Sequence, residues 1–383
     1  MRKIFFLLFF FIIFILIFNI NSKSVKEEEI RGIFISYIEL GNYLRGKNKV
    51  EGKKEVKKMV NEIDNLGFNT IILQVRSFSD AIYYSDIFPS SAVLGNKEGE
   101  SLKFDVLNCF LKYSKKRNIK VVAWINPYRI RSDSDYSDIS KSNPAYSLLK
   151  TEHVYIGDGI FYNPASKKVQ KLIVEGIEEI LKKYDVWAIL FDDYFYPEGN
   201  VDELEYRNYL KEKKDISLSD FRLLMVNTLV KNVYKLCHKY NSKFIISPDG
   251  NIENNYQKHY ADVKGWAQKK GYVDYLMPQI YYGFYNETKP FYETIKEWKK
   301  FSKKVKLIPA LAFYKVGSVD SFAMSGKNEW LEENDIIMRE VLVARNLEGV
   351  YGFSLFRYDY LFNNSYFTDT TMKEVENLKK VLD

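Results

Sequence analysis

The chain has 383 residues, of which 46% are hydrophobic, so it is long enough and apolar enough to bury a substantial core. Its net charge of +7 comes from 57 basic and 50 acidic residues spread along the length, without the sustained basic block expected of a nucleic-acid-binding protein. We therefore expect a folded protein with no nucleic-acid partner. Cys109 and Cys237 each complete an apolar helical stripe, and nothing in the pattern requires a disulfide.

The first 24 residues differ in kind from the rest of the chain. A positively charged start precedes an uninterrupted apolar run over residues 4–18. Such a run is typical of an export signal, and its length lies between that of a cleavable signal peptide and a short membrane anchor. The Ser-Lys-Ser at residues 22–24 slightly favours cleavage. We expect a linker over residues 25–30 and one extracytoplasmic domain over residues 31–383, secreted or attached to the membrane only through an uncleaved N-terminal segment.

Eight segments rich in β-formers alternate with segments of helical periodicity. The predicted strands cover residues 31–38, 69–76, 120–126, 187–191, 244–248, 273–280, 306–312 and 349–355. The predicted helices cover residues 56–66, 106–113, 169–184, 219–240, 260–267, 291–301, 332–345 and the stretch from about 371. Eight strand–helix units without a break in composition predict an α/β fold, a (β/α)8 TIM barrel with insertions.

Long connections follow several of the predicted strands. Residues 77–101, 127–166 and 194–217 each lead from a strand to a helix, whereas the connections from helix to strand are short. Active sites of such barrels lie at the carboxyl ends of the strands, among these loops. The asymmetry therefore predicts on which face the site lies.

Asp192 and Asp193 directly follow the fourth predicted strand. A buried carboxylate is costly unless it is paired or used, so two adjacent acids there indicate chemistry, with a helix N-cap or a solvated strand end as the alternative. Alternate residues of a barrel strand face the interior and the helices. Ile189 and Phe191 suit the helix side, which points Asp192 inward. We predict Asp192 as the principal catalytic acid and Asp193, at the lip, in support.

Polar and aromatic residues gather at the other strand ends as well. The candidate ligand-binding residues are Glu39, Gln74, Arg76, Trp124, Asn126, Tyr128, Arg129, Tyr194, Tyr196, Gln279, Tyr281, Tyr282 and Tyr314, with Asp249 as a further candidate acid. Gln74 and Arg76 are two residues apart on a predicted strand, so we expect them on one side. Rings stack on the apolar face of a sugar, which predicts a carbohydrate ligand in contact with two or three of these rings.

Other chemistries are poorly represented in the sequence. The three histidines form no HxH or HExxH pattern, and there is no GxSxG elbow and no Gly-rich phosphate loop. We therefore expect neither a metal nor another cofactor. Carboxylate chemistry remains by elimination as well as by position.

Several motifs in a fixed order match a known family. They are RGIFIS from Arg31, GFNTIILQVRSFSDAIYYSDIFPSSAVL from Gly67, AWINPYRI from Ala123, FDDYFYP from Phe191, ISP from Ile246, YLMPQIYY from Tyr275 and GVYGFSLF from Gly349. From residue 31 to about 356 the chain resembles the glycosyl hydrolase-like 10 family, a bacterial group of predicted (β/α)8 glycosidases. That family is similar to the hydrolase domain of poly-N-acetylglucosamine-processing enzymes, which implies a role for Asp192 and Asp193. Asp249 departs from the family, whose members usually carry an apolar residue there.

We expect an extracytoplasmic glycoside hydrolase acting on a bacterial cell-wall or extracellular glycan, with amino sugars among its candidate units. A glycosidase needs two carboxyl groups, or one and a substrate group. The seventh predicted strand supplies none, which leaves Asp249, Glu39, Asp80 or the substrate itself as the second group. The alternatives are a barrel that binds glycan without cutting it, and a lyase or transglycosylase. The oligomeric state is not indicated.

Overall fold

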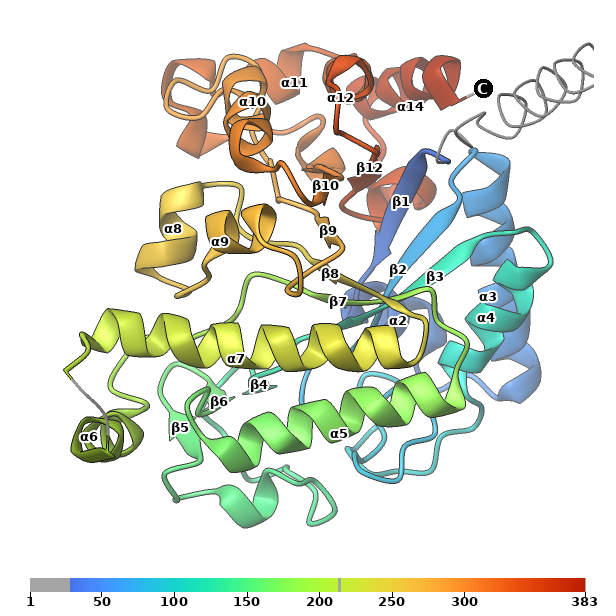
Figure 1. Ribbon diagram of the computed structural model, residues 1–383. Coiled ribbons are helices and arrows are strands. Elements are labelled where there is room, and N and C mark those ends of the chain that lie inside the picture. The colour runs from blue at the N-terminus through green and yellow to red at the C-terminus, as the bar shows by residue number, and fades with distance from the viewer. Residues whose placement is uncertain (1–27, 213–214, 383) are drawn as a thin grey trace, which may run out of the picture.

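A computed structural model describes residues 28–212 and 215–382. In this part of the chain nine parallel strands form one curled sheet surrounded by helices (Figure 1). The strands of this sheet are β1 (Ile30–Ile35), β2 (Thr70–Arg76), β3 (Lys120–Ile125), β7 (Ala188–Phe191), β8 (Lys243–Ile246), β9 (Tyr275–Leu276), β10 (Lys306–Leu307), β11 (Ala310–Leu311) and β12 (Gly352–Leu355). The predicted export segment lies outside the described residues. Within them, no helix combines the length and apolar character needed to cross a bilayer.

The seventh strand position is divided between β10 and β11. The sheet order is β10-β9-β8-β7-β3-β2-β1-β12-β11, so the two halves stand at its opposite ends. Between them lies Pro309, which has no N–H for the ladder. Leu307 bridges to Val350 ahead of β12, and Ala310 bridges to Gln279 beyond β9. These bridges bring the two ends of the sheet close together. The predicted α/β architecture is therefore confirmed, in the form of a TIM-barrel-like curled sheet.

Each strand position is followed by at least one helix. The helices are α2 (Tyr37–Leu44), α3 (Lys49–Asn65), α4 (Val106–Lys115), α5 (Lys167–Lys183), α6 (Glu203–Glu212), α7 (Leu218–Lys239), α8 (Ile252–Gln257), α9 (Val263–Gln268), α10 (Phe291–Phe301), α11 (Glu329–Glu332), α12 (Ile336–Asn346), α13 (Asp359–Phe362) and α14 (Asp369–Leu382). Two long helices, α5 and α7, lie side by side on one flank (Figure 1). Both begin at a serine N-cap, Ser166 and Ser217, which satisfies a free backbone N–H of the first turn.

The two faces of the sheet carry separate apolar clusters. Ala188 and Leu190 of β7 belong to a cluster inside the curled sheet, together with Phe34. Ile189 and Phe191 belong to the larger cluster between the sheet and the helices. The parity predicted for this strand is therefore confirmed, and it directs the next residue, Asp192, toward the interior.

The first strand is shorter than predicted. β1 ends at Ile35, and Ser36 then caps α2 in a capping box, in which Glu39 also bonds the backbone N–H of Ser36. Ser36 and Glu39 have the spacing typical of this motif, so the chain turns into a helix where the sequence predicted more strand and then a loop. Glu39 consequently lies inside a helix and not at a strand end.

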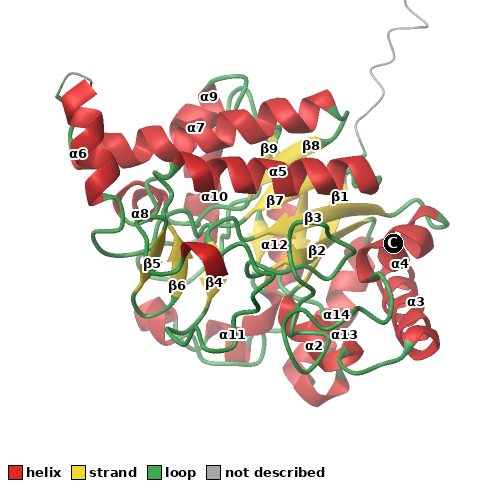
Figure 2. Cartoon of the chain, turned by 90° about the horizontal axis from the view of Figure 1, so that it is seen from below, coloured by secondary structure: helices red, strands yellow, loops and turns green. Residues whose placement is uncertain are grey.

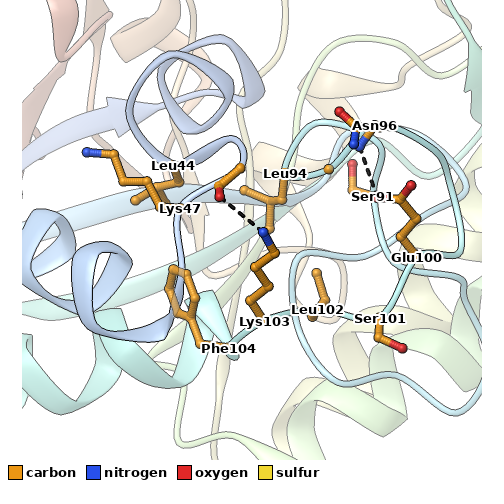
Figure 3. Close-up of a pocket in the computed structure, with 12 residues that line it drawn as sticks. Leu44, Lys47, Ser91, Leu94, Asn96, Glu100, Ser101, Leu102, Lys103 and Phe104 are labelled. Carbon is orange, nitrogen blue, oxygen red and sulfur yellow. Dashed lines mark hydrogen bonds between the residues drawn. The ribbon is translucent and has the colours of Figure 1, made fainter.

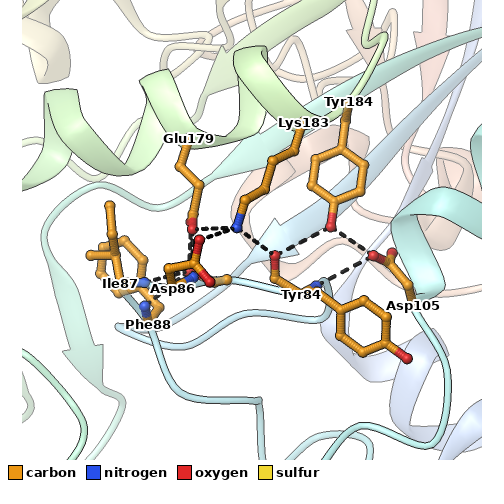
Figure 4. A network of polar contacts seen from close by, with 9 residues as sticks. Tyr84, Asp86, Ile87, Phe88, Asp105, Glu179, Lys183 and Tyr184 are labelled. Carbon is orange, nitrogen blue, oxygen red and sulfur yellow. Dashed lines mark hydrogen bonds and ion pairs between the residues drawn. The ribbon is translucent and has the colours of Figure 1, made fainter.

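The long loops are partly folded. Residues 127–166 contain the antiparallel strands β4 (Arg129–Arg131), β5 (Val154–Ile156) and β6 (Ile160–Tyr162), in the order β4-β6-β5, and residues 194–217 contain α6 (Figure 2). The loop after β2 is fixed to α5, where Lys183 donates to Asp86 at 2.7 Å and Tyr184, at the end of the helix, donates to Asp105 at 2.6 Å (Figure 4). Loops held in this way can keep ligand-binding side chains in place.

Both ends of the described chain lie at the amino-terminal edge of the sheet. Glu29, just before β1, pairs with Arg345 at 2.7 Å. Arg31 donates to the backbone oxygen of Leu382 at 2.9 Å, which ties α14 to the same edge. The carboxyl-terminal edge is therefore left to the long loops.

Candidate active site

A pocket of about 270 Å³ opens at the carboxyl ends of the strands. Its lining residues, here called the acid pocket, are Phe34, Ser36, Tyr37, Ile38, Gln74, Trp124, Arg129, Asp192, Asp193, Tyr194, Ser247, Gln279, Tyr281, Phe356 and Arg357. Most of them come from the ends of β1, β2, β3, β7, β8, β9 and β12 or from the residues that follow these strands, and Arg129 comes from β4. This is the face that the loop lengths predicted.

Asp192 is buried and held by donors from the neighbouring strand position, β3, and from the turn that follows Asp192. Its Oδ2 accepts a hydrogen bond from Trp124 Nε1 at 3.2 Å and another from Asn126 Nδ2. Its Oδ1 accepts from the backbone N–H of Tyr194 at 3.4 Å. Gln74 in turn donates to Asn126 Oδ1 at 2.5 Å. β2 and β3 thus fix the orientation of the acid that β7 carries.

Asp193 lies at the lip and has fewer partners. Its Oδ1 accepts from Gln279 Nε2 at 3.1 Å, and the same amide nitrogen donates to the backbone oxygen of Ser247 at 3.0 Å. The backbone N–H of Tyr194, the next residue, donates to Asp192 and not to Asp193. Asp193 therefore shares the pocket, as predicted, through β8 and β9.

Burial raises the pKa of both aspartates above the ordinary carboxyl range. The pKa of Asp192 rises because the group is removed from water and because Asp193 lies beside it. Burial also raises the pKa of Asp193, with a smaller contribution from the negative charge of Asp249. The positive charge of Arg129 acts against both shifts. The pair therefore holds a proton at a pH where a solvated aspartate would be ionised.

Aromatic rings form the floor of the acid pocket. Phe34 meets Trp124 edge to face at a centroid distance of 5.5 Å and Phe356 at 5.6 Å. Tyr281 stands 5.8 Å from Phe356 on the other side. Packed rings beside a carboxylate pair offer an apolar surface for a sugar ring next to groups that exchange protons.

The structure does not bring Arg76 into the pocket. The register between β2 and β3 shifts between Gln74 and Arg76, which marks a β-bulge. An inserted residue reverses the side on which the following side chains point. Gln74 accordingly lines the pocket, whereas the guanidinium of Arg76 lies 4.3 Å from the ring of Phe88 and beside Gly176 of α5. The expectation that the two side chains share one side is wrong.

The candidates for a second acid outside the Asp pair lie elsewhere. Glu39 is fully buried and pairs with Arg357 at 3.0 Å. Asp249 accepts from the backbone N–H of Asn251 at 2.7 Å and from the side chain of Asn254 at 2.9 Å. Asp80 is buried in the loop after β2. None of Glu39, Asp80 and Asp249 lines the acid pocket.

Three of the seven predicted rings, Trp124, Tyr194 and Tyr281, line the acid pocket. Of the other four, Tyr128 and Tyr196 are buried below the loops, while Tyr282 and Tyr314 are partly buried near β9. Sequence reasoning missed Phe34, Tyr37 and Phe356 as lining residues. The inward parity of β1 identifies Phe34, and the capping box explains why Tyr37 turns toward the pocket.

A tighter pocket of about 70 Å³ lies between the end of α2 and the loop after β2 (Figure 3). Lys103 there donates to the backbone oxygen of Gly46 at 3.1 Å, and Glu100 accepts from the backbone N–H of Asn96 at 3.1 Å. These two hydrogen bonds hold the loop after β2 in place.

In residues 28–212 and 215–382, no group of three or more His, Cys, Asp and Glu side chains is placed to hold a metal ion.

A curled parallel sheet with an aspartate pair at its carboxyl edge, above a floor of aromatic rings, defines a glycosidase-like barrel. The family model described as "Glycosyl hydrolase-like 10" matches residues 29–328. The chain belongs to this family, as its motifs suggested.

Two named relatives are glycosyl hydrolases. The chain is 30% identical to "Glycosyl hydrolase YngK" of Bacillus subtilis over 366 residues, which cover 88% of this chain and 69% of that protein. It is 28% identical to "Glycosyl hydrolase DigH" of Escherichia coli K12, over 79% of this chain and 75% of that protein.

Solved structures with a similar fold include two glycosidase domains. The glycoside hydrolase domain of PgaB (BpsB) from Bordetella bronchiseptica has a TM-score of 0.59 at 12% identity, covering 93% of this chain and 99% of that one. The catalytic domain of β-amylase from Paenibacillus polymyxa has a TM-score of 0.56 at 12% identity, covering 94% and 100%. At these identities the likeness concerns the fold.

Proposed function

We propose that the protein is an extracytoplasmic glycoside hydrolase that cleaves a bacterial cell-wall or extracellular glycan containing amino sugars. The observation that carries the proposal is the adjacent pair Asp192 and Asp193 in a pocket with an aromatic floor. Membership of the family and the relatives' names support the reaction class. The location rests on the apolar run of residues 4–18, and the sugar class rests on motifs similar to those of poly-N-acetylglucosamine-processing enzymes.

Hydrogen bonds distinguish the roles of the two acids. Asp192 accepts from three N–H groups, those of Trp124, Asn126 and the Tyr194 backbone. Such donors favour a carboxylate over a carboxylic acid. Asp193 accepts from one side-chain donor, Gln279, among the described residues. We therefore assign the proton to Asp193 and the negative charge to Asp192, which exchanges the roles that strand parity alone suggested.

The assignment gives each acid a step in hydrolysis. Asp193 gives its proton to the glycosidic oxygen, and the electron pair of the breaking C–O bond leaves with that oxygen. The carboxylate of Asp192 stabilises the positive charge that develops at the anomeric carbon. Water supplies the new oxygen on that carbon, and its released proton restores the acid pair. Neighbouring carboxyl groups repel each other when both are charged, so the pair keeps one proton available.

A substrate screen tests the function. The full chain is incubated with peptidoglycan strands and with deacetylated poly-N-acetylglucosamine, and released fragments are identified by mass spectrometry. We expect hydrolysis of at least one polymer by the parent and loss of release with Asp192→Asn. Retention on a polymer without release would instead support a glycan-binding barrel, and unsaturated or lengthened products would support a lyase or transglycosylase. Fractionation of cells producing the full chain tests the location.

An activated substrate separates the two acids. An aryl glycoside with a good leaving group needs little help from a proton donor. We expect Asp193→Asn to retain much of its rate on this substrate while losing activity on the natural bond, and Asp192→Asn to lose both. The opposite pattern would restore Asp192 as the acid.

A further inference from the structure

A second pocket, of about 200 Å³, lies directly beside the acid pocket. Arg129 and Tyr194 line both pockets, so these two side chains form the wall between them. The second pocket, here called the side pocket, also includes Phe161, Tyr196 and Lys258. These residues come from the loops after β3, β7 and β8 and not from the barrel strands themselves. The side pocket is therefore a feature of the insertions.

The wall between the pockets is anchored. Arg129 donates from Nε to the backbone oxygen of Ser77 at 3.1 Å, and its guanidinium lies 4.9 Å from the ring of Phe78. The ring of Tyr194 packs 5.6 Å from the same guanidinium. Tyr194 nonetheless keeps 52% of its surface exposed. An exposed ring held on a fixed cation, next to Asp193 in the chain, is a surface over which a polymer can lie.

The side pocket combines an apolar floor with a polar rim. Tyr128 and Tyr196 are buried at its base, and Tyr196 donates its hydroxyl to Asp202 at 3.1 Å, which leaves the ring of Tyr196 as its contact surface. Phe161 adds a ring from β6, and the exposed Lys258 adds an amine at the rim. A pyranose unit has the matching chemistry, an apolar C–H face and a rim of hydroxyl or amide groups.

We propose that the side pocket is a sugar-binding subsite that holds one unit of the glycan next to the unit in the acid pocket. The inference rests on the proposed glycosidase function and says where the glycan continues beyond the acid pocket. A glycan that fills both pockets crosses Tyr194, so the acids meet a bond flanked by bound sugars. The protein therefore favours longer chains over the shortest ones.

Binding by an inactive variant tests the subsite. β-1,4-linked N-acetylglucosamine oligomers of increasing length are titrated calorimetrically into full-length Asp192→Asn. We expect affinity to rise by roughly tenfold at the length that reaches the side pocket. Adding Phe161→Ala should abolish this rise and leave the affinity for the shortest bound oligomer unchanged. Phe322→Ala, which removes an 85% exposed ring that lines neither pocket, is the matched control.

Lys258→Ala provides a second variant, because an exposed lysine can be removed without disturbing the packing of β6. It should weaken the longer oligomers alone, by about threefold. No rise with length, no binding of any oligomer, or a rise that survives both variants would overturn the subsite. If the parent cuts no glycan while the length effect holds, the hydrolase proposal fails and the subsite stands. If it cuts without a length effect, the subsite fails and the hydrolase stands.

Discussion

Two pairs of carboxyl groups with raised pKa values occur in different parts of this molecule. Asp192 and Asp193 line the acid pocket, whereas Glu340 of α12 and Glu374 of α14 are fully buried between packed helices. Burial raises the pKa in both places, well above the usual range for Glu340 and to about 7 for Glu374. A perturbed pKa is thus common to both pairs.

The surroundings of the two pairs differ. Asp192 receives hydrogen bonds from Trp124 and Asn126 and opens into a pocket. Neither carboxyl oxygen of Glu340 has a hydrogen-bond partner among the described residues, and Glu374 accepts from the backbone N–H of Met338 at 3.1 Å. A raised pKa alone therefore does not identify the candidate active site. It is distinguished by an open pocket and by hydrogen-bond donors directed at the carboxyl group. The helix pair is expected to affect stability alone.

The largest effect that separates the pairs is on turnover. Asp192→Asn and Asp193→Asn should each lower glycan cleavage by about 100- to 10,000-fold, the range for removal of a positioned acid or base. Glu340→Gln should cleave at the parental rate, because Glu340 lies outside the pocket. Initial rates of reducing-end release from one glycan measure all three. Parental turnover in both aspartate variants would remove the catalytic assignment.

The next effect is on stability as a function of pH. Glu374 is ordinarily expected near 4.5 and is raised to about 7 in the fold, so the unfolded chain ionises first and the free energy of unfolding falls as the pH rises between these values. The shift corresponds to about 3 kcal/mol.

A double variant tests that slope. Glu340→Gln combined with Glu374→Gln should flatten the decline, as measured by urea unfolding from pH 4 to pH 8. Asp193→Asn serves as a comparison that leaves the helix pair unchanged. An equally steep decline in the double variant would show that this carboxyl pair is not its source.

A smaller effect concerns the donors to Asp192. Trp124→Phe keeps a ring against Phe34 but removes the N–H that bonds Asp192 at 3.2 Å. A hydrogen bond to a charged group contributes roughly 1.5–3 kcal/mol, which corresponds to a loss of about ten- to a hundredfold in kcat. That bond lowers the pKa of Asp192, so its removal should move the pH–rate profile toward higher pH. An unchanged profile would show that Trp124 acts only by packing.

The smallest effect separates two residues of β2. Gln74→Met should reduce turnover several-fold, because Gln74 positions Asn126, which holds Asp192. Arg76→Met should leave KM unchanged, since the bulge turns Arg76 toward Phe88 and α5. Both constants are measured on the same glycan, with thermal unfolding as the control for folding. A raised KM with Arg76→Met would place its side chain at the ligand after all.

Much of the fold follows from periodicity in the sequence. The eight strand positions, the inward parity of Asp192 and the long loops at one edge depend on local patterns and on the chirality of parallel sheets, so they were predictable. The early end of β1 was also predictable from the capping-box spacing of Ser36 and Glu39. The hydrophobic residues around Ser36 favoured a longer strand instead.

Other parts of the site depend on long-range packing. The bulge that separates Gln74 from Arg76 arises from the register with β3, which no pattern within β2 reports. The engagement of Glu39 by Arg357 joins residues more than 300 positions apart. The hydrogen bonds that distinguish Asp192 from Asp193 come from β3 and β9, so they required the three-dimensional arrangement.

The amino-terminal edge, where Glu29 meets Arg345 and Arg31 holds Leu382, lies opposite the opening of the acid pocket. Glu29 and Leu382, near the two ends of the described chain, therefore both lie at the back of the molecule. A tether, an affinity handle or a solid support fused there leaves the mouth of the pocket clear. A domain immobilised at this edge should therefore still admit a bulky ligand to the acid pocket.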